Sequence, residues 1–158
     1  FEYNNLHPSE MEKRTEILKH FLGATGKQLL IEQPFRCDYG YNIRVGENFY
    51  ANMGCTILDE ALVTFGDNVL LAPNVSIYTA GHAVNVAQRV TGWEYAYPVT
   101  VGHNVWIGGN VVILPGVSIG DNSIIGGGSV VTKDIPANVI AVGNPCKVIR
   151  ELTEDELK

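Results

Sequence analysis

A six-residue repeat in the second half of the chain constrains the fold more than any other feature. From residue 101 the sequence divides into VGHNVW, IGGNVV, ILPGVS, IGDNSI, IGGGSV and VTKDIP, and an aliphatic residue opens each unit. Glycine follows it in most units, and a smaller residue stands four places on. Because a β-strand alternates its faces every two residues, a period of six indicates a short strand, a turn and another strand on a new face.

This repeat predicts an all-β solenoid, a parallel β-helix in which three faces close each coil and the aliphatic residues stack in the core. Glycine and asparagine would form its tight corners. A weaker form of the pattern begins at Val45, so we expect the β-helix to occupy residues 31–148. Between Ile57 and Phe65 the spacing is eight, which predicts a two-residue bulge at one corner.

Residues 78–98 have no six-residue register and are predicted to leave the β-helix as a projecting loop. Loops on rigid scaffolds often carry function. His82 lies at the root of this loop between Gly81 and Ala83, where small neighbours would let the imidazole reach a cleft. Histidine is the commonest general base near neutral pH, although an isolated loop histidine is more often only a surface residue.

The two ends of the chain differ from the repeat. In SEMEKRTEILKHFLG, Ser9 and Glu12 have capping-box spacing and Gly23 follows an apolar face of Met11, Leu18, Phe21 and Leu22. We therefore expect residues 1–30 to form an N-terminal helical cap, truncated upstream because the chain begins at Phe1. Residues 149–158 are predicted to form a short C-terminal helix over the other end.

Composition excludes several classes of protein. At 158 residues and 46% hydrophobic content, the chain suits one domain. Its net charge is -6, its basic residues are scattered, and it has no run of about 20 apolar residues, so neither nucleic acid nor a membrane is an expected partner. Three cysteines without CxxC spacing favour the reducing cytoplasm over a disulfide framework or a zinc ribbon.

The stretches NVWIGGNVVILPGVSIGDNSIIGGGSVVTKDIP and GNPCKVIR, with the loop histidine, resemble the maltose and galactoside O-acetyltransferase group of the hexapeptide-repeat acyltransferases. The resemblance extends to HPSEMEKR and DYGYNIRVGENFYAN. It implies a left-handed β-helix that transfers an acetyl group from acetyl-CoA to a sugar hydroxyl (galactoside, maltose or glucose type), without a metal. It also implies a homotrimer with sites between subunits, consistent with outward apolar Val112, Ile124 and Val130.

The resemblance implies roles for individual residues. His82 matches the family's general base, although Ala83 replaces the family's proline, and Glu94 could orient its imidazole or stabilise the protonated ring. Asn52 completes this catalytic set, but a turn-corner asparagine is an equal alternative. The acceptor would be bound by Asp38, Tyr50, Asn52, Asp59, Glu60 and Trp93. A turn role for Asp59 and a solvated carboxylate for Glu94 stay open.

The late repeats are expected to bind coenzyme A. Gly109 and Gly127 would leave room for the pantetheine arm, although both could be plain turn glycines. Hydroxyl and cationic side chains suit the phosphates of the nucleotide end. The full predicted set is Trp106, Gly109, Gly127, Thr132, Lys133, Lys147 and Arg150, in which Trp106 would border the thioester.

Three alternatives stay open. A γ-type carbonic anhydrase shares the β-helix but needs three zinc-binding histidines, of which only His82 and His103 lie in the repeats. A non-catalytic scaffold predicts no thioester chemistry. An acetyltransferase with a non-sugar acceptor is the third, because an acceptor contact of the family lies upstream of HPSE. Cys55 is not expected to be a nucleophile, since it occupies a small inward position.

Overall fold

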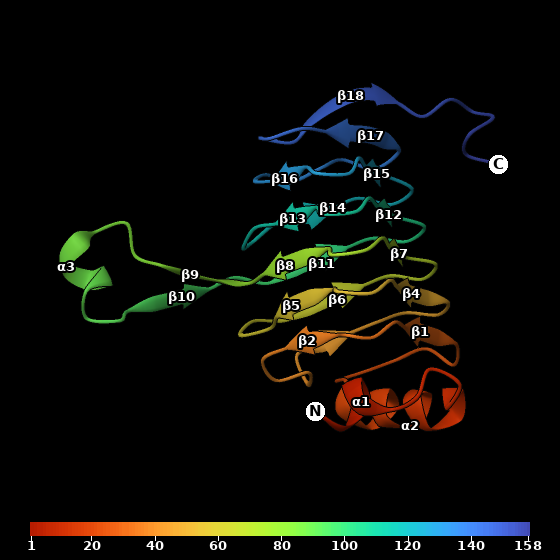
Figure 1. The fold of residues 1–158 in the computed structure, drawn as a ribbon. Helices are drawn as coiled ribbons and strands as arrows, with labels where there is room; N and C mark the ends of the chain where they lie inside the picture. Colours follow the sequence, from red (N-terminus) through yellow and green to blue (C-terminus); the bar gives the residue numbers. More distant parts are fainter.

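The computed structural model describes residues 1–158, which form a three-sided prism of stacked coils (Figure 1). Sheet I contains β1 (Leu29–Ile31), β4 (Phe49–Ala51), β7 (Leu70–Leu71), β12 (Trp106–Ile107), β15 (Ile124–Ile125), β17 (Val139–Val142) and β18 (Lys147–Glu151). Sheet II contains β2 (Arg36–Cys37), β5 (Thr56–Leu58), β8 (Ser76–Tyr78), β13 (Val112–Ile113) and β16 (Val130–Val131). Sheet III contains β3 (Ile43–Arg44), β6 (Val63–Phe65), β11 (Val99–Val101) and β14 (Ser118–Ile119). The predicted parallel β-helix is therefore confirmed.

The aliphatic residues that open the repeats form the core. Their side chains are at most 2% exposed at Val101, Ile107, Ile113, Ile119, Ile125 and Val131. Parallel pairing sets them one above another, as in the register Ile107↔Ile125 between β12 and β15. Each coil alone could not bury its apolar side chains, so the coils stabilise one another through this stacking.

Asparagine forms one edge of the prism, the corner between sheets III and I. Its members have left-handed backbone conformations with φ between 55° and 62°, and they are Asn48, Asn68, Asn104, Asn122 and Asn138. In each of the first four, Nδ2 donates to the Oδ1 of the asparagine one coil on, at 2.7–3.0 Å, and the ladder ends at Asn138. The predicted corner role of asparagine is thus observed, and the amide ladder links successive coils.

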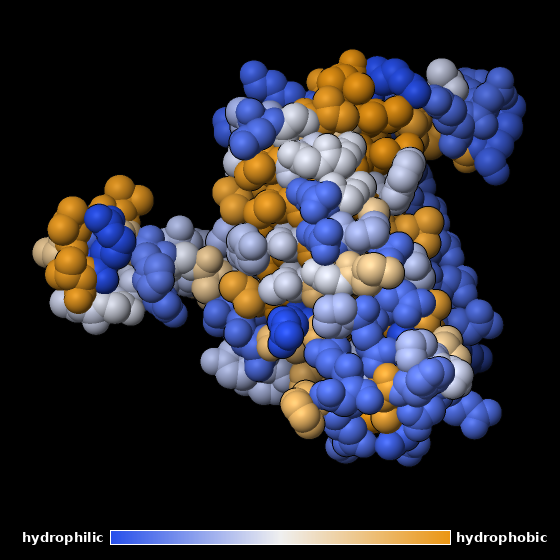
Figure 2. All heavy atoms as spheres, viewed as in Figure 1, coloured by the Kyte–Doolittle hydropathy of each residue, from blue (hydrophilic) through white to orange (hydrophobic).

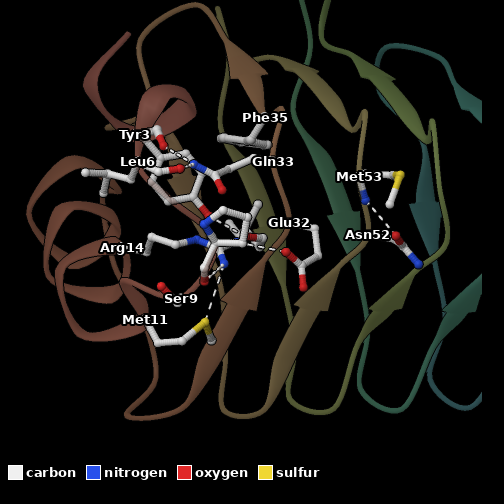
Figure 3. A network of polar contacts seen from close by, with 12 residues as sticks. Tyr3, Leu6, Ser9, Met11, Arg14, Glu32, Gln33, Phe35, Asn52 and Met53 are labelled. Carbon is white, nitrogen blue, oxygen red and sulfur yellow. Dashed lines mark hydrogen bonds and ion pairs between the residues drawn. The ribbon is translucent and has the colours of Figure 1, made fainter.

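A helical cap covers the open edge of the first coil (Figures 1 and 3). It consists of α1 (Glu2–Asn5) and α2 (Met11–Phe21). Arg14, only 2% exposed, donates to the Ile31 carbonyl at 2.8 Å and to the Glu32 carboxylate at 2.9 Å. The Tyr3 hydroxyl also donates to the Ile31 carbonyl. The bonds from Arg14 and Tyr3 satisfy the Ile31 carbonyl, which no earlier coil pairs.

The start of α2 differs from the prediction. The N-cap is Glu10 rather than Ser9, and no side chain caps the helix, so the Ser9–Glu12 capping box is wrong. The Glu10 carboxylate instead accepts the backbone N–H of His7 at 2.9 Å, within the HPSE turn. That turn leads into α2. The carboxylate that stabilises it belongs to Glu10, two residues before the Glu12 of the expected capping box.

The predicted C-terminal helix is also wrong. Residues Lys147–Glu151 form β18, which pairs antiparallel with β17, and turns follow to the end of the chain. The last coil leaves the edge of sheet I unpaired, and an added strand satisfies those backbone groups better than a helix lying across them. The cap at this end is thus made of backbone hydrogen bonds.

The excursion between β8 and β11 forms a long arm that projects from the prism (Figure 1), as the repeat break predicted. The arm comprises residues 79–98, with β9 (Ala80–His82), α3 (Val86–Arg89) and β10 (Glu94–Ala96). Its tip is apolar and exposed (Figure 2), with Val84 at 92% and Val90 at 76%.

The helices α1, α2 and α3 all lack the length and the apolar character that a membrane-spanning helix requires.

The contacts of the helical cap predict that Arg14 contributes more to the free energy of unfolding than its neighbour Lys13. Arg14→Met should lower the free energy of unfolding by about 2–3 kcal/mol, because the charged hydrogen bonds to residues 31 and 32 are lost. Lys13→Met is the control, since Lys13 makes only an exposed pair with Glu2 at 3.5 Å. Urea unfolding of both variants measures the difference, and equal effects would show that Arg14 does not secure the cap.

Candidate active site

His82 and Glu94 face each other across the two strands of the arm. They are directly paired in the β9–β10 register, and His82 Nε2 lies 3.4 Å from Glu94 Oε1. Both side chains are 55% exposed, so the imidazole is open to a substrate. A carboxylate in contact with an imidazole can orient the ring. The structure thus brings together the two arm residues that the sequence analysis named as the catalytic pair.

Acidic residues gather below the arm, at the corner between sheets II and III. Asp38 lies in the turn after β2, and Glu60 lies in the bulge after β5. Desolvation, followed by the charge of Glu60 and a hydrogen bond to it, raises the pKa of Asp38. The two carboxyl groups are therefore neighbours, and both are accessible from solvent.

Asp59 does not belong to this accessible group. It is completely buried, and its carboxylate accepts the backbone N–H groups of Asp38, Tyr39 and Gly40 at 2.8–3.0 Å. The predicted contact with an acceptor is contradicted, because every approach to the carboxylate is occupied by the turn. Asp59 instead fixes the turn that presents Asp38.

Other predicted residues occupy the corner between sheets I and II. Asn52 follows β4, Gly109 follows β12 and Gly127 follows β15. The Asn52 Oδ1 accepts the N–H of Met53 at 2.8 Å, so part of its capacity serves the turn. A Cβ on Gly109 would lie 3.3 Å from the Pro73 carbonyl oxygen, and one on Gly127 would lie 3.2 Å from that of Gly109. Close stacking of coils therefore also favours glycine there.

Two predicted aromatic residues lie on the outer face of sheet I, where Tyr50 shares a hollow with Asn48, and Trp106 shares one with Asn104 and Asn122. Tyr50 and Trp106 align through Leu70, which pairs with both. Trp106 is 51% exposed and is not a packed core residue. Trp93 is equally exposed but lies far out on the arm.

The predicted site residues thus form two columns. The II–III column, on the corner that carries the arm, contains Asp38, Glu60, His82, Glu94, Thr132 and Lys133. The I–II column, with the adjoining face of sheet I, contains Tyr50, Asn52, Trp106, Gly109 and Gly127. Within one chain, sheet II separates the columns. One chain therefore does not bring His82 and Asn52 together.

Comparisons with known proteins decide the family. Residues 98–133 match the model of the bacterial transferase hexapeptide (six repeats). The chain is 53% identical to the galactoside O-acetyltransferase of Escherichia coli over 98% of this chain and 76% of that protein. The chain belongs to the galactoside and maltose O-acetyltransferase group of the hexapeptide-repeat acyltransferases.

Solved structures of this group superpose closely. A galactoside acetyltransferase in complex with coenzyme A has a TM-score of 0.96 and 52% identity, covering 99% of this chain and 78% of that one. A maltose O-acetyltransferase from Clostridium difficile has a TM-score of 0.95 and 58% identity, covering 96% and 81%. The resemblance to this family is therefore confirmed over 96–99% of this acetyltransferase.

The cations of the acetyltransferase are not equivalent. Arg150 makes two hydrogen bonds of 2.7 Å to the carboxylate of Glu156, so the turn after β18 already occupies its guanidinium. Lys133 and Lys147 are exposed and take part in none of the ion pairs. Of the three predicted cations, Lys133 and Lys147 have no ion-pair partner within the chain, whereas Arg150 has one.

The cysteines have the environment of core residues. Burial raises the pKa of the Cys55 thiol to about 11, and burial with the charges of Asp59 and Asp38 raises that of Cys37 to about 12. A thiol with so high a pKa carries little thiolate at neutral pH and is a poor nucleophile. No group of three or more His, Cys, Asp or Glu side chains could hold a metal ion, and His82 and His103 lie at different corners.

Two residues of the site region escaped the sequence analysis. For Asp59, the structure shows the turn role that was left open beside the acceptor role, and Thr79, which is completely buried at the root of the arm, was not identified. Both stand two places after a core isoleucine, Ile57 or Ile77, and so occupy inward positions of a strand. A polar residue at an inward position beside a break in the repeat was the available signal.

The Arg150–Glu156 pair predicts how the C-terminal tail responds to pH. The hydrogen bonds from Arg150, then that from the Thr153 N–H, lower the pKa of Glu156 to about 2. Because the folded pKa lies below the ordinary value, the pair stabilises the tail above that value and is lost as pH falls through about 2.

A carboxyl carbon NMR titration should show the low midpoint for Glu156. Arg150→Gln should return the midpoint toward the ordinary value of a glutamate, whereas Lys147→Gln should leave it in place. A midpoint that ignores Arg150 would mean that the pair does not form in solution.

Proposed function

We propose that this acetyltransferase transfers the acetyl group of acetyl-CoA to a hydroxyl of a sugar of the galactoside, maltose or glucose type, with His82 as the general base. The observation that carries the proposal is the accessible His82–Glu94 pair at the root of the arm. The names of the galactoside and maltose acetyltransferases that the chain resembles support the donor and the acceptor class.

The reaction is a direct displacement. A ring nitrogen of His82 takes the proton of the sugar hydroxyl while that oxygen attacks the thioester carbonyl carbon. Glu94 stabilises the imidazolium. The tetrahedral intermediate then collapses, the carbon–sulfur bond breaks, and the proton returns from His82 to the sulfur of coenzyme A. No covalent acyl-enzyme forms, so much of the rate comes from holding both substrates together.

The two columns support a site shared between chains. The II–III column of one chain would supply His82, Glu94, Asp38 and Glu60, and the I–II column of a neighbour would supply Asn52, Tyr50 and Trp106. Coenzyme A would lie between them, with pantetheine along Gly109 and Gly127 and its phosphates near Thr132, Lys133 and Lys147. A closed ring of three chains presents every column to a partner, and a homotrimer is the assembly that we propose.

The role of His82 is tested by acetyl-CoA-dependent thiol release with a panel of sugars. His82→Ala should lower the rate by about a hundredfold or more, the scale of a lost general base. His20→Ala is the control, because His20 is exposed on α2 away from the arm and should not change the rate. If the wild-type enzyme binds coenzyme A but acetylates no sugar, the acceptor is not a sugar.

The shared site predicts complementation between two inactive variants. Trimers made only of His82→Ala or only of Asn52→Ala chains should be inactive. When both chains are co-expressed in equal amounts, about one quarter of the sites should combine an intact Asn52 with an intact His82 from its neighbour. Native mass spectrometry establishes that the chains mix. Mixed trimers without recovered activity would show that each site uses one chain only.

A further inference from the structure

The bulge after β5 and the root of the arm are two breaks in the repeat that lie side by side. Strands β5 and β8 are parallel neighbours, with Leu58 paired to Tyr78. The next residues, Asp59 in the bulge and Thr79 in the arm, are both completely buried. The two-residue insertion is thus placed directly beneath the point at which the arm leaves the prism.

Thr79 uses all of its polar groups at this junction. Its N–H donates to the Leu58 carbonyl at 3.1 Å, and its Oγ1 donates to the same oxygen at 2.7 Å. Its Oγ1 also accepts the N–H of Ala61 at 2.9 Å. Its carbonyl accepts the N–H of Tyr97, on the returning side of the arm, at 2.8 Å. One residue therefore ties both sides of the arm to the bulge.

Within one chain, no hydrogen bond or ion pair of residues 80–96 reaches the prism. The hydrogen bonds and the ion pair of residues 80–96 lie within the arm, as the His82–Glu94 contact does. An isolated two-stranded ribbon is marginally stable, and its direction depends on its attachment. Figure 1 shows how far the arm extends from that attachment.

We propose that Thr79 is a positioning residue that aims the arm and thereby places the His82 imidazole over the acetyl group. The inference rests on the proposed function, because it assigns Thr79 to the same reaction. The hydroxyl does not touch a substrate. It acts through the bulge, whose Asp59 and Glu60 also connect to the turn at Asp38, so the base and the candidate acceptor carboxylates share one rigid support.

The test compares Thr79→Val, which keeps the shape but removes the hydroxyl, with Thr79→Ser, which keeps the hydroxyl. Ser123→Ala is a matched control, since Ser123 is also completely buried and its hydroxyl donates to the Pro136 carbonyl at 2.8 Å, away from the arm. Steady-state kinetics should show a kcat lowered about 10- to 100-fold in Thr79→Val, as for a displaced catalytic group. The KM for acetyl-CoA should stay unchanged, and Thr79→Ser should retain most of the activity.

A double-mutant comparison separates positioning from general stability. In the His82→Ala background, Thr79→Val should cause no further loss of kcat, because a positioning residue acts only through the group that it positions. Deuterium exchange gives a readout independent of activity: amides of residues 80–97 should exchange faster in Thr79→Val than in the wild type and Ser123→Ala. If Thr79→Val does not fold, Thr79→Ala replaces it in every comparison.

The outcomes distinguish this inference from the proposed function. Wild-type turnover with equal kcat in Thr79→Val and Ser123→Ala would overturn the positioning role and leave the general base in place. Additive losses with His82→Ala would also overturn it. If the wild type transfers no acetyl group, the proposed function fails, and unchanged exchange of the arm in Thr79→Val would then overturn the role of Thr79 independently.

Discussion

The stacking of inward aliphatic residues one coil apart is the constraint on which the rest of the structure depends. It requires each coil to repeat the path of the one before, with a parallel register on all three sheets. The corners must then turn tightly at the same height in every coil, which explains the left-handed asparagines and the close contact at Gly108, where a Cβ would lie 2.5 Å from the Gly127 nitrogen. Departures from the repeat are tolerated only where a coil can bulge outward.

A solenoid has two ends, and this chain closes them by different means. At the first coil, Arg14 and Tyr3 both donate from their side chains to the Ile31 carbonyl, which no strand pairs. At the last coil, β18 turns back along β17 and pairs the edge with backbone alone. Both solutions satisfy backbone groups at a sheet edge, and both protect that edge from pairing with another chain.

The candidate active site lies where the regular stacking of coils is interrupted. The bulge at Asp59 and the arm at Thr79 fall in consecutive coils, so one corner gains acidic groups, a histidine and a carboxylate partner for it. At the corner of Gly109 and Gly127 the repeat is not interrupted. The coils stack closely there, and no side chain projects from either glycine. In the proposed function, the first corner supplies the general base and the second binds the extended cofactor. Sheet II separates the two corners within one chain, which is why we propose a site shared between chains.

The sequence by itself determined the β-helix, the inward positions and the root of the arm, because a six-residue period admits one way to bury its aliphatic side chains. It also located His82 as the residue at the break. Only the tertiary structure decided that Asp59 and Thr79 are buried partners, that Arg150 is occupied by Glu156, and that the tail adds a strand instead of a helix. The contacts of Asp59 and Thr79 join successive coils, 19 and 21 residues apart, and those of the tail depend on the unpaired edge of the last coil. Local propensity carries no information about either kind of contact.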